Sequence, residues 1–367
     1  MTIDHNLGLA EPTEEAGFAE LTGPTGSTGP QESLLGPGST AVAHPNIALI
    51  KYWGKRDEQL VIPYVDSLSM TLDVFPTHTT VRLDPEAQTD GVILDGRPAE
   101  GEPRRRVVVF LDLVRELAGR TERAAVDTRN AVPTGAGLAS SASGFAALAV
   151  AATAAYGLDL DPTALSRLAR RGSASASRSI FGGFALCHAG RGVGEAADLS
   201  SYAEPVPLPD FDPALVVALV NAGPKAVSSR AAMRRTVETS PLYQAWATSS
   251  KGDLTDMRAA LLRGDLEAVG EIAERNALGM HATMLAARPA VRYLSPATVA
   301  VLDGVLQLRK DGVAAYATMD AGPNVKVLCH PEAAPRVAET LLAAAPGCSV
   351  LTARRGPGAR LRTADEQ

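Results

Sequence analysis

The chain has 367 residues and a formal charge of −6, with an isoelectric point near 5.6. This length allows two domains of ordinary size, and the weakly acidic balance argues against a nucleic-acid-binding protein. Three widely spaced cysteines exclude a disulfide framework or a paired-cysteine metal site and suit a cytoplasmic protein. The histidines form no zinc-binding pattern, and no apolar run reaches the roughly 18 residues of a membrane span.

The second half of residues 1–40 is rich in glycine, proline, serine and threonine, and we expect this stretch to be a disordered extension. It lacks the charged segment and apolar core of a secretory signal. The folded part is expected to begin at Ala41, with a strand over 41–52 that starts irregularly near Pro45. Strands over 79–83 and 92–94, the latter entering a hairpin turn, and a helix over 105–118 should follow.

Residues 133–144 read P-T-G-A-G-L-A-S-S-A-S-G and run directly into an apolar, alanine-rich segment over 145–156. The pattern predicts a glycine loop that leads into a buried helix. Free backbone N–H groups and the positive end of the helix dipole favour an anion there, and Ser140, Ser141 and Ser143 add hydroxyls for phosphate or Mg²⁺. The segment is not a P-loop, because no Gly-Lys-Ser/Thr follows. A flexible turn capped by serine is the alternative.

The second half of the chain alternates helices with strands. This mixture predicts an α+β fold in two lobes, with a boundary in the proline-rich stretch 205–213. The predicted helices cover 162–171, 240–262, 266–285, 295–310 and 332–344, and the predicted strands cover 180–187, 215–220, 314–319, 325–329 and 349–352.

Segment 46–57 places Lys51 and Lys55 beside Trp53. A compact ammonium next to an apolar ring suits a polyphosphate carried on a short carbon chain. A surface hairpin with lysines at these positions by chance is the alternative.

Segment 171–183 alternates serines up to Arg178, whose guanidinium can hold a carboxylate through two parallel hydrogen bonds. In segment 319–325, Asp320 ends an apolar strand at a Gly-Pro turn, where functional carboxylates are often displayed. A linker is the alternative for the first segment, and a turn-forming aspartate is the alternative for the second.

Together these motifs resemble those of the diphosphomevalonate decarboxylases, a family within the GHMP superfamily of small-molecule kinases. The resemblance covers Ala41 to about Arg355 and lies in the glycine loop and in segments 46–57, 170–183, 225–230, 276–283 and 319–325. It implies a two-lobed GHMP-kinase-like fold, with an N-terminal ATP-binding lobe that carries the glycine/serine loop and a ferredoxin-like C-terminal lobe. The expected domains are 41–210 and 211–356, with a tail over 357–367.

The resemblance also implies roles for the residues at matching positions. The implied catalytic residues are Asp320, as the catalytic carboxylate, Arg178 and Lys51. The implied substrate-binding residues are Tyr52, Trp53, Gly54, Lys55, Ser173, Ala174, Ser175, Ala176, Ser177 and Arg178. The implied ATP-binding residues are Gly135, Ala136, Gly137, Leu138, Ala139, Ser140, Ser141, Ser143, Lys225 and Ser229. No protein motif supplies a metal site, so Mg²⁺ is expected to arrive with ATP and to lie near Ser141.

The chain departs from the family pattern at two places. The family usually reads P-x-N-S-S-I-S-x-T-L, whereas residues 63–72 place Val65 and Asp66 at two small polar positions. The family also carries an arginine before an L-N-G turn. Here the turn reads Leu94-Asp95-Gly96, and Arg82 or Arg97 would have to replace that arginine.

The resemblance implies that ATP phosphorylates the tertiary hydroxyl of mevalonate 5-diphosphate, and that loss of phosphate and CO₂ then gives isopentenyl diphosphate. The expected partners are ATP, Mg²⁺ and this substrate, without nucleic acid or membrane, in a cytoplasmic homodimer. Two alternatives among enzymes stay open: a decarboxylase of mevalonate 5-phosphate, or a kinase that stops at the 3-phosphate. A non-catalytic ATP-binding protein is the alternative outside enzymes.

Overall fold

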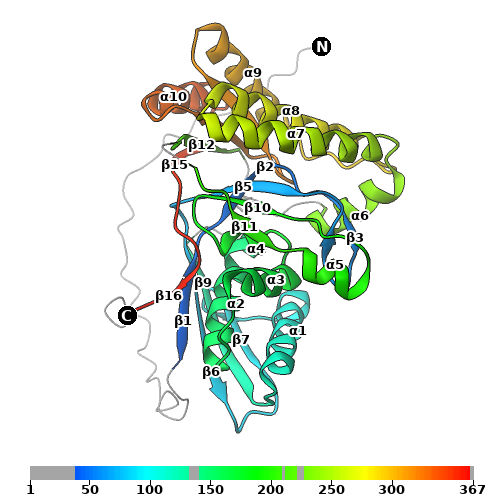
Figure 1. Ribbon diagram of the computed structural model, residues 1–367. Coiled ribbons are helices and arrows are strands. Elements are labelled where there is room, and N and C mark those ends of the chain that lie inside the picture. Colours follow the sequence, from blue (N-terminus) through cyan, green and yellow to red (C-terminus); the bar gives the residue numbers. More distant parts are fainter. Residues whose placement is uncertain (1–37, 132–139, 209–210, 221–226, 364–367) are drawn as a thin grey trace, which may run out of the picture. The chain divides into compact units, whose positions relative to one another are not determined.

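The computed structural model describes residues 38–131, 140–208, 211–220 and 227–363. The chain divides into two compact units, Met1–Leu34 and Leu35–Gln367, and all described residues belong to the second unit. Three larger sheets, one two-stranded sheet and ten α-helices form most of the described part of this unit (Figure 1). None of the helices in these ranges combines the length and apolarity needed to cross a bilayer.

The first sheet has six strands in the order β16-β1-β6-β9-β7-β8. Its buried face carries the alternate residues of β6 and packs against α2, an alanine-rich helix that is apolar on all sides. Helices α1 and α3 complete this core (Figure 1). The strands are β1 Ser39–Ala43, β6 Thr77–Asp84, β7 Gly91–Leu94, β8 Arg97–Pro98, β9 Arg123–Asn130 and β16 Arg360–Leu361, and the helices are α1 Gly101–Ala118, α2 Ser140–Ala155 and α3 Pro162–Gly172.

The second sheet has the order β11-β10-β5-β2 and is buried on both faces of its central strand β5. Along β5, Leu68 and Met70 enter one hydrophobic core, while Ser67 and Ser69 lie on the opposite face. This alternation places buried hydroxyls beside α4. The elements of this region are β2 Asn46–Ile50, β5 Ser67–Thr71, β10 Phe184–Cys187, β11 Ala203–Pro205, the short hairpin β3 Lys55–Asp57 and β4 Ile62–Pro63, and helices α4 Ala176–Ser179 and α5 Gly194–Ser200.

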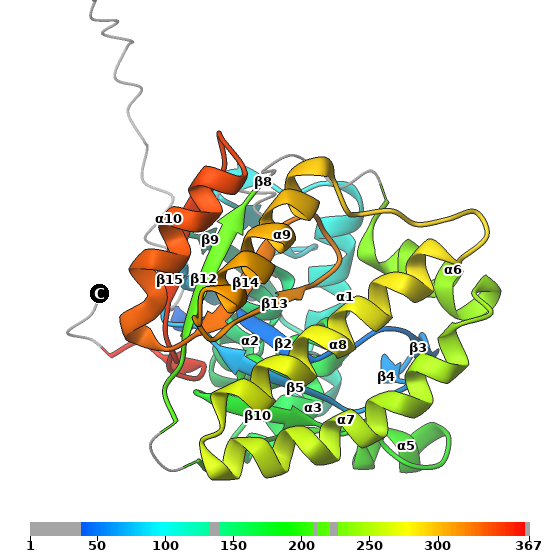
Figure 2. The same cartoon turned by 90° about the horizontal axis from the view of Figure 1, so that it is seen from above.

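The third sheet has the order β13-β14-β12-β15, with α9 and α10 on one face and the helix pair α7 and α8 on the other (Figures 1 and 2). Helices α7 and α8 also pack on β2, so one core joins the second and third sheets. The strands are β12 Ala214–Leu219, β13 Ala315–Met319, β14 Val325–Cys329 and β15 Ser349–Ala353, and the helices are α6 Ser229–Thr239, α7 Tyr243–Arg263, α8 Leu266–Leu285, α9 Pro296–Lys310 and α10 Ala334–Ala344, preceded by a 3₁₀ turn at Pro331–Ala333.

Helix α8 lies unusually close to β13 because it carries glycine at position 270. A Cβ atom there would lie 2.1 Å from Cδ2 of Tyr316, so only glycine allows this separation. The close approach matters for the site, since β13 ends one residue before Asp320.

The α+β class is confirmed, and most predicted elements are present within a few residues of their expected ends. The hairpin after β7 is confirmed as a two-residue turn, in which Asp95 and Gly96 both have positive φ. The single strand expected over 41–52 is wrong. Pro45 interrupts it, and the halves β1 and β2 enter different sheets.

The expected disorder of residues 1–40 is wrong at its end, because Ser39 and Thr40 already pair with β6. Residues 1–37 lie outside the described ranges. The strand expected over 180–187 begins only at Phe184, since the segment before it forms α4 and a turn.

Candidate active site

Arg178 lies at the centre of a buried polar cluster between α4 and the second sheet. Its Nε donates to Ser69 Oγ at 3.0 Å and to Asn46 Oδ1 at 3.3 Å, and its Nη1 donates to Ser67 Oγ at 2.8 Å. The amide of Asn46 is fixed in turn by donating to Ser179 Oγ. In these bonds the guanidinium contacts only neutral oxygens. Burial lowers its pKa. A carboxylate would supply the charge that these partners do not.

Asp320 lies directly after β13 and is contacted by two lysines from different segments of the chain. Lys51, just after β2, places Nζ 2.8 Å from Oδ1, and Lys326 on β14 places Nζ 3.3 Å from Oδ2. Both lysine side chains are almost completely buried, whereas that of Asp320 is 30% exposed. The carboxylate thus has a route to ligand while its cations are shielded from water.

These charges set the protonation of the centre. Burial would raise the pKa of Asp320, but the ammonium groups of Lys51 and Lys326 outweigh burial and hold that pKa well below its usual range. Burial also lowers the pKa of Lys51 to about 8, against the attraction of Asp320. At neutral pH the carboxylate is ionised and Lys51 is mostly protonated.

His281 on α8 contacts the backbone of the same turn. Its Nε2 lies 3.2 Å from the backbone oxygen of Asp320, and burial followed by the charge of Lys51 lowers its pKa to about 4. The ring is therefore neutral at pH 7, and this geometry requires the proton on Nε2 because a carbonyl can only accept.

In segment 52–55, Tyr52 brings a polar group that is open to a ligand. Its hydroxyl, like Nε1 of the neighbouring Trp53, is buried without a hydrogen-bond partner among the described residues, and burial raises the pKa of the hydroxyl. After burial, the charge of Glu58 raises this pKa further, while the charges of Arg178 and Arg230 lower it. An unsatisfied buried hydroxyl can donate to an anionic ligand that these two cations attract.

The next three residues of that segment contribute differently. Trp53 packs into a core with Tyr243 and Trp246. Gly54 has φ +94°, and a Cβ there would lie 2.2 Å from the Tyr243 hydroxyl, so glycine is needed for the backbone. Lys55 pairs with the exposed Glu58, while burial lowers its pKa.

A chain of serine hydroxyls links the start of α2 to segment 173–175. Ser141 Oγ lies 3.3 Å from Ser173 Oγ, which lies 3.1 Å from Ser175 Oγ. The neighbouring side chains point inward instead. Ala174 and Ala176 are buried, and Ser177 donates to the Ala174 oxygen. These three side chains support the segment, and the hydroxyls of Ser173 and Ser175 stay available for a ligand.

A cavity of about 170 Å³ opens between α1 and α2, beside these serines. Its walls are largely apolar, which suits a planar base, and Ser141 and Asn130 bring polar groups to it. Arg106 lines the same cavity, lies 4.7 Å from the centre of the Phe145 ring and donates to the Gly172 oxygen. The residues therefore fit a nucleotide whose phosphates approach the start of α2.

The described residues contain no cluster of three or more metal-binding side chains. Hydroxyls at Ser141 and Ser173 suit Mg²⁺ that is already bound to phosphates, since Mg²⁺ takes oxygen ligands and usually keeps several of them from substrate.

Two models of protein domains match this chain. The diphosphomevalonate decarboxylase-like N-terminal domain matches residues 43–203, and the mevalonate 5-diphosphate decarboxylase C-terminal domain matches residues 215–358. A phosphomevalonate decarboxylase from Haloferax volcanii is 35% identical over 329 residues, which are 89% of this chain and 98% of the relative. The chain belongs to the diphosphomevalonate decarboxylase family.

Solved structures of the family have the same fold. Mevalonate diphosphate decarboxylase from Staphylococcus aureus is 40% identical with a TM-score of 0.85, covering 89% of this chain and 98% of that one. A structure of MDDEF in complex with MVAPP, AMPPCP and magnesium is 45% identical with a TM-score of 0.84, at the same coverage of 89% and 98%. These similarities confirm the GHMP-kinase-like fold expected from the family resemblance.

Several residues expected to bind ATP cannot be placed. Gly135, Ala136, Gly137, Leu138, Ala139 and Lys225 lie outside the described residues, and Ser140 is described only as the first residue of α2. Ser143 is buried and accepts from Thr77 at 2.7 Å, and Ser229 begins α6.

The departures from the family pattern also have structural outcomes. Asp66 accepts from the Ala189 N–H at 2.6 Å and so holds a backbone turn, while Val65 joins the core around Trp53. Arg82 and Arg97 are both exposed on the first sheet, and neither lines the cavity beside α2.

Sequence reasoning missed several groups of the site in this family member. Ser67 and Ser69 contact Arg178, and the signal was their strict alternation with apolar residues. Lys326 was missed as well, although a lone lysine in the apolar strand V-K-V-L-C marks it. Asn276 accepts from the backbone N–H of Lys51, which fixes the residue that contacts Asp320.

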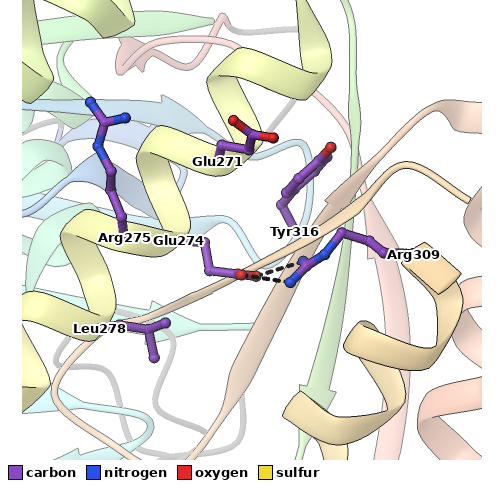
Figure 3. Close-up of a pocket in the computed structure, with 6 residues that line it drawn as sticks. All are labelled: Glu271, Glu274, Arg275, Leu278, Arg309 and Tyr316. Atoms are coloured by element: carbon purple, nitrogen blue, oxygen red, sulfur yellow. Dashed lines mark hydrogen bonds and ion pairs between the residues drawn. The ribbon is translucent and has the colours of Figure 1, made fainter.

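A second pocket, of about 250 Å³, lies between α8, α9 and the edge of β13 (Figure 3). Two of its polar side chains bond to each other: both terminal nitrogens of Arg309 donate to Glu274 at 2.8–2.9 Å. Glu274 also accepts from the Ala317 N–H at 2.7 Å, and Arg309 donates to the Ala315 oxygen at 2.8 Å. The ion pair therefore completes the hydrogen bonding of the β13 edge.

Proposed function

We propose that this chain catalyses the ATP-dependent decarboxylation of mevalonate 5-diphosphate to isopentenyl diphosphate, ADP, phosphate and CO₂. The observation that carries the proposal is one buried centre in which Lys51 and Lys326 contact the carboxylate of Asp320 and the guanidinium of Arg178 lies within electrostatic reach of it. Such an excess of positive charge is unfavourable unless anions bind there. The substrate brings both a carboxylate and a diphosphate, and family membership gives the reaction.

Arg178 is the group that holds the substrate carboxylate. Its two contacts to serines and its contact to Asn46 fix the guanidinium plane before ligand arrives. A fixed plane aligns the C–C bond that must break. Because a tight ion pair also stabilises bound substrate, the benefit to the rate comes from this orientation.

The diphosphate is proposed to lie against Tyr52, Lys55, Ser173 and Ser175. Support comes from the unpartnered Tyr52 hydroxyl and from the chain of serine hydroxyls. In addition, burial lowers the pKa of Lys55, Glu58 raises it, and the charges of Arg230 and Arg106 lower it, so three cations and one carboxylate share this region. Trp53 and Gly54 would shape this wall through packing and backbone geometry, as would Ala174, Ala176 and Ser177.

ATP is proposed to place its base in the cavity between α1 and α2 and its phosphates at the start of α2. The apolar walls and Ser141 support this placement. The segment 135–143, Lys225 and Ser229 keep their expected ATP-binding roles as proposals. Mg²⁺ would neutralise phosphate charge during transfer.

In the reaction, the tertiary hydroxyl forms a bond to the terminal phosphorus of ATP, and the bond to ADP breaks. The C–O bond then breaks with phosphate as leaving group, and the electron pair of the breaking C–C bond forms the alkene as CO₂ departs. Asp320 orients the hydroxyl and accepts its proton late, and its charge then stabilises positive charge that develops at the carbon. Its low pKa makes it a weak base, so orientation and charge are its larger contributions.

Product analysis tests the proposal. The purified chain is given ATP and, in separate reactions, mevalonate, its 5-phosphate and its 5-diphosphate, and CO₂, ADP and the organic product are quantified. We expect CO₂ and isopentenyl diphosphate from the 5-diphosphate. Preferred turnover of the 5-phosphate would show that this chain is a phosphomevalonate decarboxylase, the activity in the name of the Haloferax relative. Accumulation of a 3-phosphate without CO₂ would make the chain a kinase.

We also propose the two domains 41–210 and 211–356, with a tail over 357–367. The matched spans 43–203 and 215–358 support these limits. A homodimer is proposed as well, and sedimentation equilibrium tests it. A cytoplasmic location is proposed on the three cysteines, which are all free thiols.

A further inference from the structure

The carboxylate of Asp320 has a separate ammonium partner for each oxygen. Lys51 contacts Oδ1 at 2.8 Å and Lys326 contacts Oδ2 at 3.3 Å. Lys326 belongs to β14, and its register partner on the neighbouring β13 is Thr318. Since Asp320 directly follows β13, the pairing of these two strands fixes the position of Lys326 relative to the carboxylate.

Burial of the charged Lys326 side chain is unfavourable, so its presence here requires a benefit that offsets this cost. Its side chain is only 2% exposed, and an apolar residue would fit a strand whose other members are Val325, Val327, Leu328 and Cys329. The charged groups around it are Asp320, Lys51 on the segment after β2, and Arg178 on α4, and His281 on α8 is neutral. One carboxylate cannot balance three cations, so stability alone does not explain the lysine.

We infer that Lys326 is a positioning residue for the decarboxylation proposed above: it fixes the second oxygen of Asp320, so that the carboxylate plane is set toward the substrate hydroxyl. Lys51 alone would hold one oxygen and leave the plane free to rotate about the Cβ–Cγ bond. Two partners on two oxygens remove that rotation before substrate binds. The inference rests on the proposed function, in which Asp320 contacts the hydroxyl.

The same arrangement links Lys326 to the ionisation of both neighbours. Besides burial, the charge of Lys326 lowers the pKa of Lys51, and it also lowers the pKa of Asp320. Removing the charge must therefore raise both pKa values. A residue that only filled space in the sheet would affect neither.

The test is Lys326→Met, which keeps the length of the side chain and removes its charge. We expect kcat to fall about 10- to 100-fold, because a misoriented reacting group costs that order of rate, while KM for ATP and for mevalonate 5-diphosphate changes little. The acidic and the alkaline limbs of the kcat/KM profile should both move to higher pH. Lys326→Arg, which restores the charge, should return the limbs toward their wild-type positions.

Lys251→Met is the matched control, because Lys251 is an exposed lysine of α7 away from the centre. It should behave as wild type in rate and pH profile. If Lys326→Met is too unstable to assay, Lys326→Gln replaces it, since the amide keeps a donor for Oδ2 without the charge. Both limbs of its kcat/KM profile should still move to higher pH.

Unshifted limbs in either neutral variant, or a wild-type kcat in Lys326→Met, would overturn the inference. A wild-type chain that releases no CO₂ from mevalonate 5-diphosphate would instead overturn the proposed function. The wild-type reaction run beside each variant keeps the two failures apart.

Discussion

At the scale of single residues, the proposed chemistry depends on one carboxylate. Asp320→Asn keeps the size and hydrogen-bonding reach of the side chain but removes its charge and its ability to accept a proton. General-base assistance is worth about 10²–10⁴-fold, and we expect kcat to fall by at least about 10³-fold. Apparent affinities for ATP and substrate should change little, because other groups hold the phosphates and the carboxylate. Turnover assays with calorimetric binding check both points.

Asp66→Asn is the control for that substitution, since Asp66 is a carboxylate whose observed bond is to a backbone N–H. It should keep most of the wild-type kcat. An Asp320→Asn enzyme with more than about a tenth of wild-type kcat and normal binding would show that Asp320 is only a turn residue.

The pKa of Lys51 predicts where activity is lost at alkaline pH. Burial lowers its pKa to about 8, so it loses its proton, and its ion pair with Asp320, as pH rises through that value. We expect kcat/KM to fall above about pH 8 and the corresponding limb of kcat to lie higher, because bound anions favour the protonated amine. Initial rates from pH 6 to 10 measure both limbs. A flat kcat/KM profile up to pH 10 would contradict the prediction.

The sequence singles out Arg178, Lys51 and Asp320 as charged residues among small or apolar ones, and their catalytic roles, which the family resemblance implies, stay predictions. The sequence could not identify the residues that contact these three side chains. Ser69 contacts Arg178 across 109 positions of sequence, and Lys326 contacts Asp320 only because two strands pair in one register. Such contacts depend on tertiary structure, which local pattern does not encode.

At the scale of elements, the close packing of α8 on β13 depends on glycine. Gly270→Ala would place Cβ against the Tyr316 ring, so we expect the free energy of unfolding to fall by about 1–3 kcal/mol. Gly252→Ala in α7 meets nothing within 4 Å and should raise it by roughly 0.5–1 kcal/mol. Urea unfolding of the two variants measures the difference. Equal stabilities would mean that α8 can move away from β13 without cost.

Long periodic elements were predictable and short buried ones were not. The helix over 266–285 was predicted with its observed ends, since its caps and periodicity agree. Strand β5 was missed, because its serines look like a loop although Arg178 satisfies them in the interior. The split between β1 and β2 follows from Pro45, but the choice of a different sheet for each half depends on strand pairing over long distances.

At the scale of the whole molecule, the division at residue 34 separates the N-terminal stretch from the unit that carries the site. Removing residues 1–37 should leave the melting temperature and the specific activity nearly unchanged, because the segment has few apolar residues to contribute to a core. Differential scanning calorimetry and the CO₂ assay on the shortened chain check this. A melting temperature lowered by several degrees would show that the segment stabilises the fold.

We expect the Glu274–Arg309 pair to hinder association of the protein with itself, because it caps one edge of a sheet. Ala315 and Ala317 would otherwise offer a free carbonyl and a free N–H at a sheet edge, which is a template for an incoming strand. Glu274→Ala removes both protections together, because Arg309 loses the partner that orients it. Heated samples of this variant should scatter light at lower temperature than Glu271→Ala, whose carboxylate lines the same pocket. A lower onset temperature for Glu274→Ala would show that resistance to aggregation depends on a carboxylate to which no catalytic role is assigned.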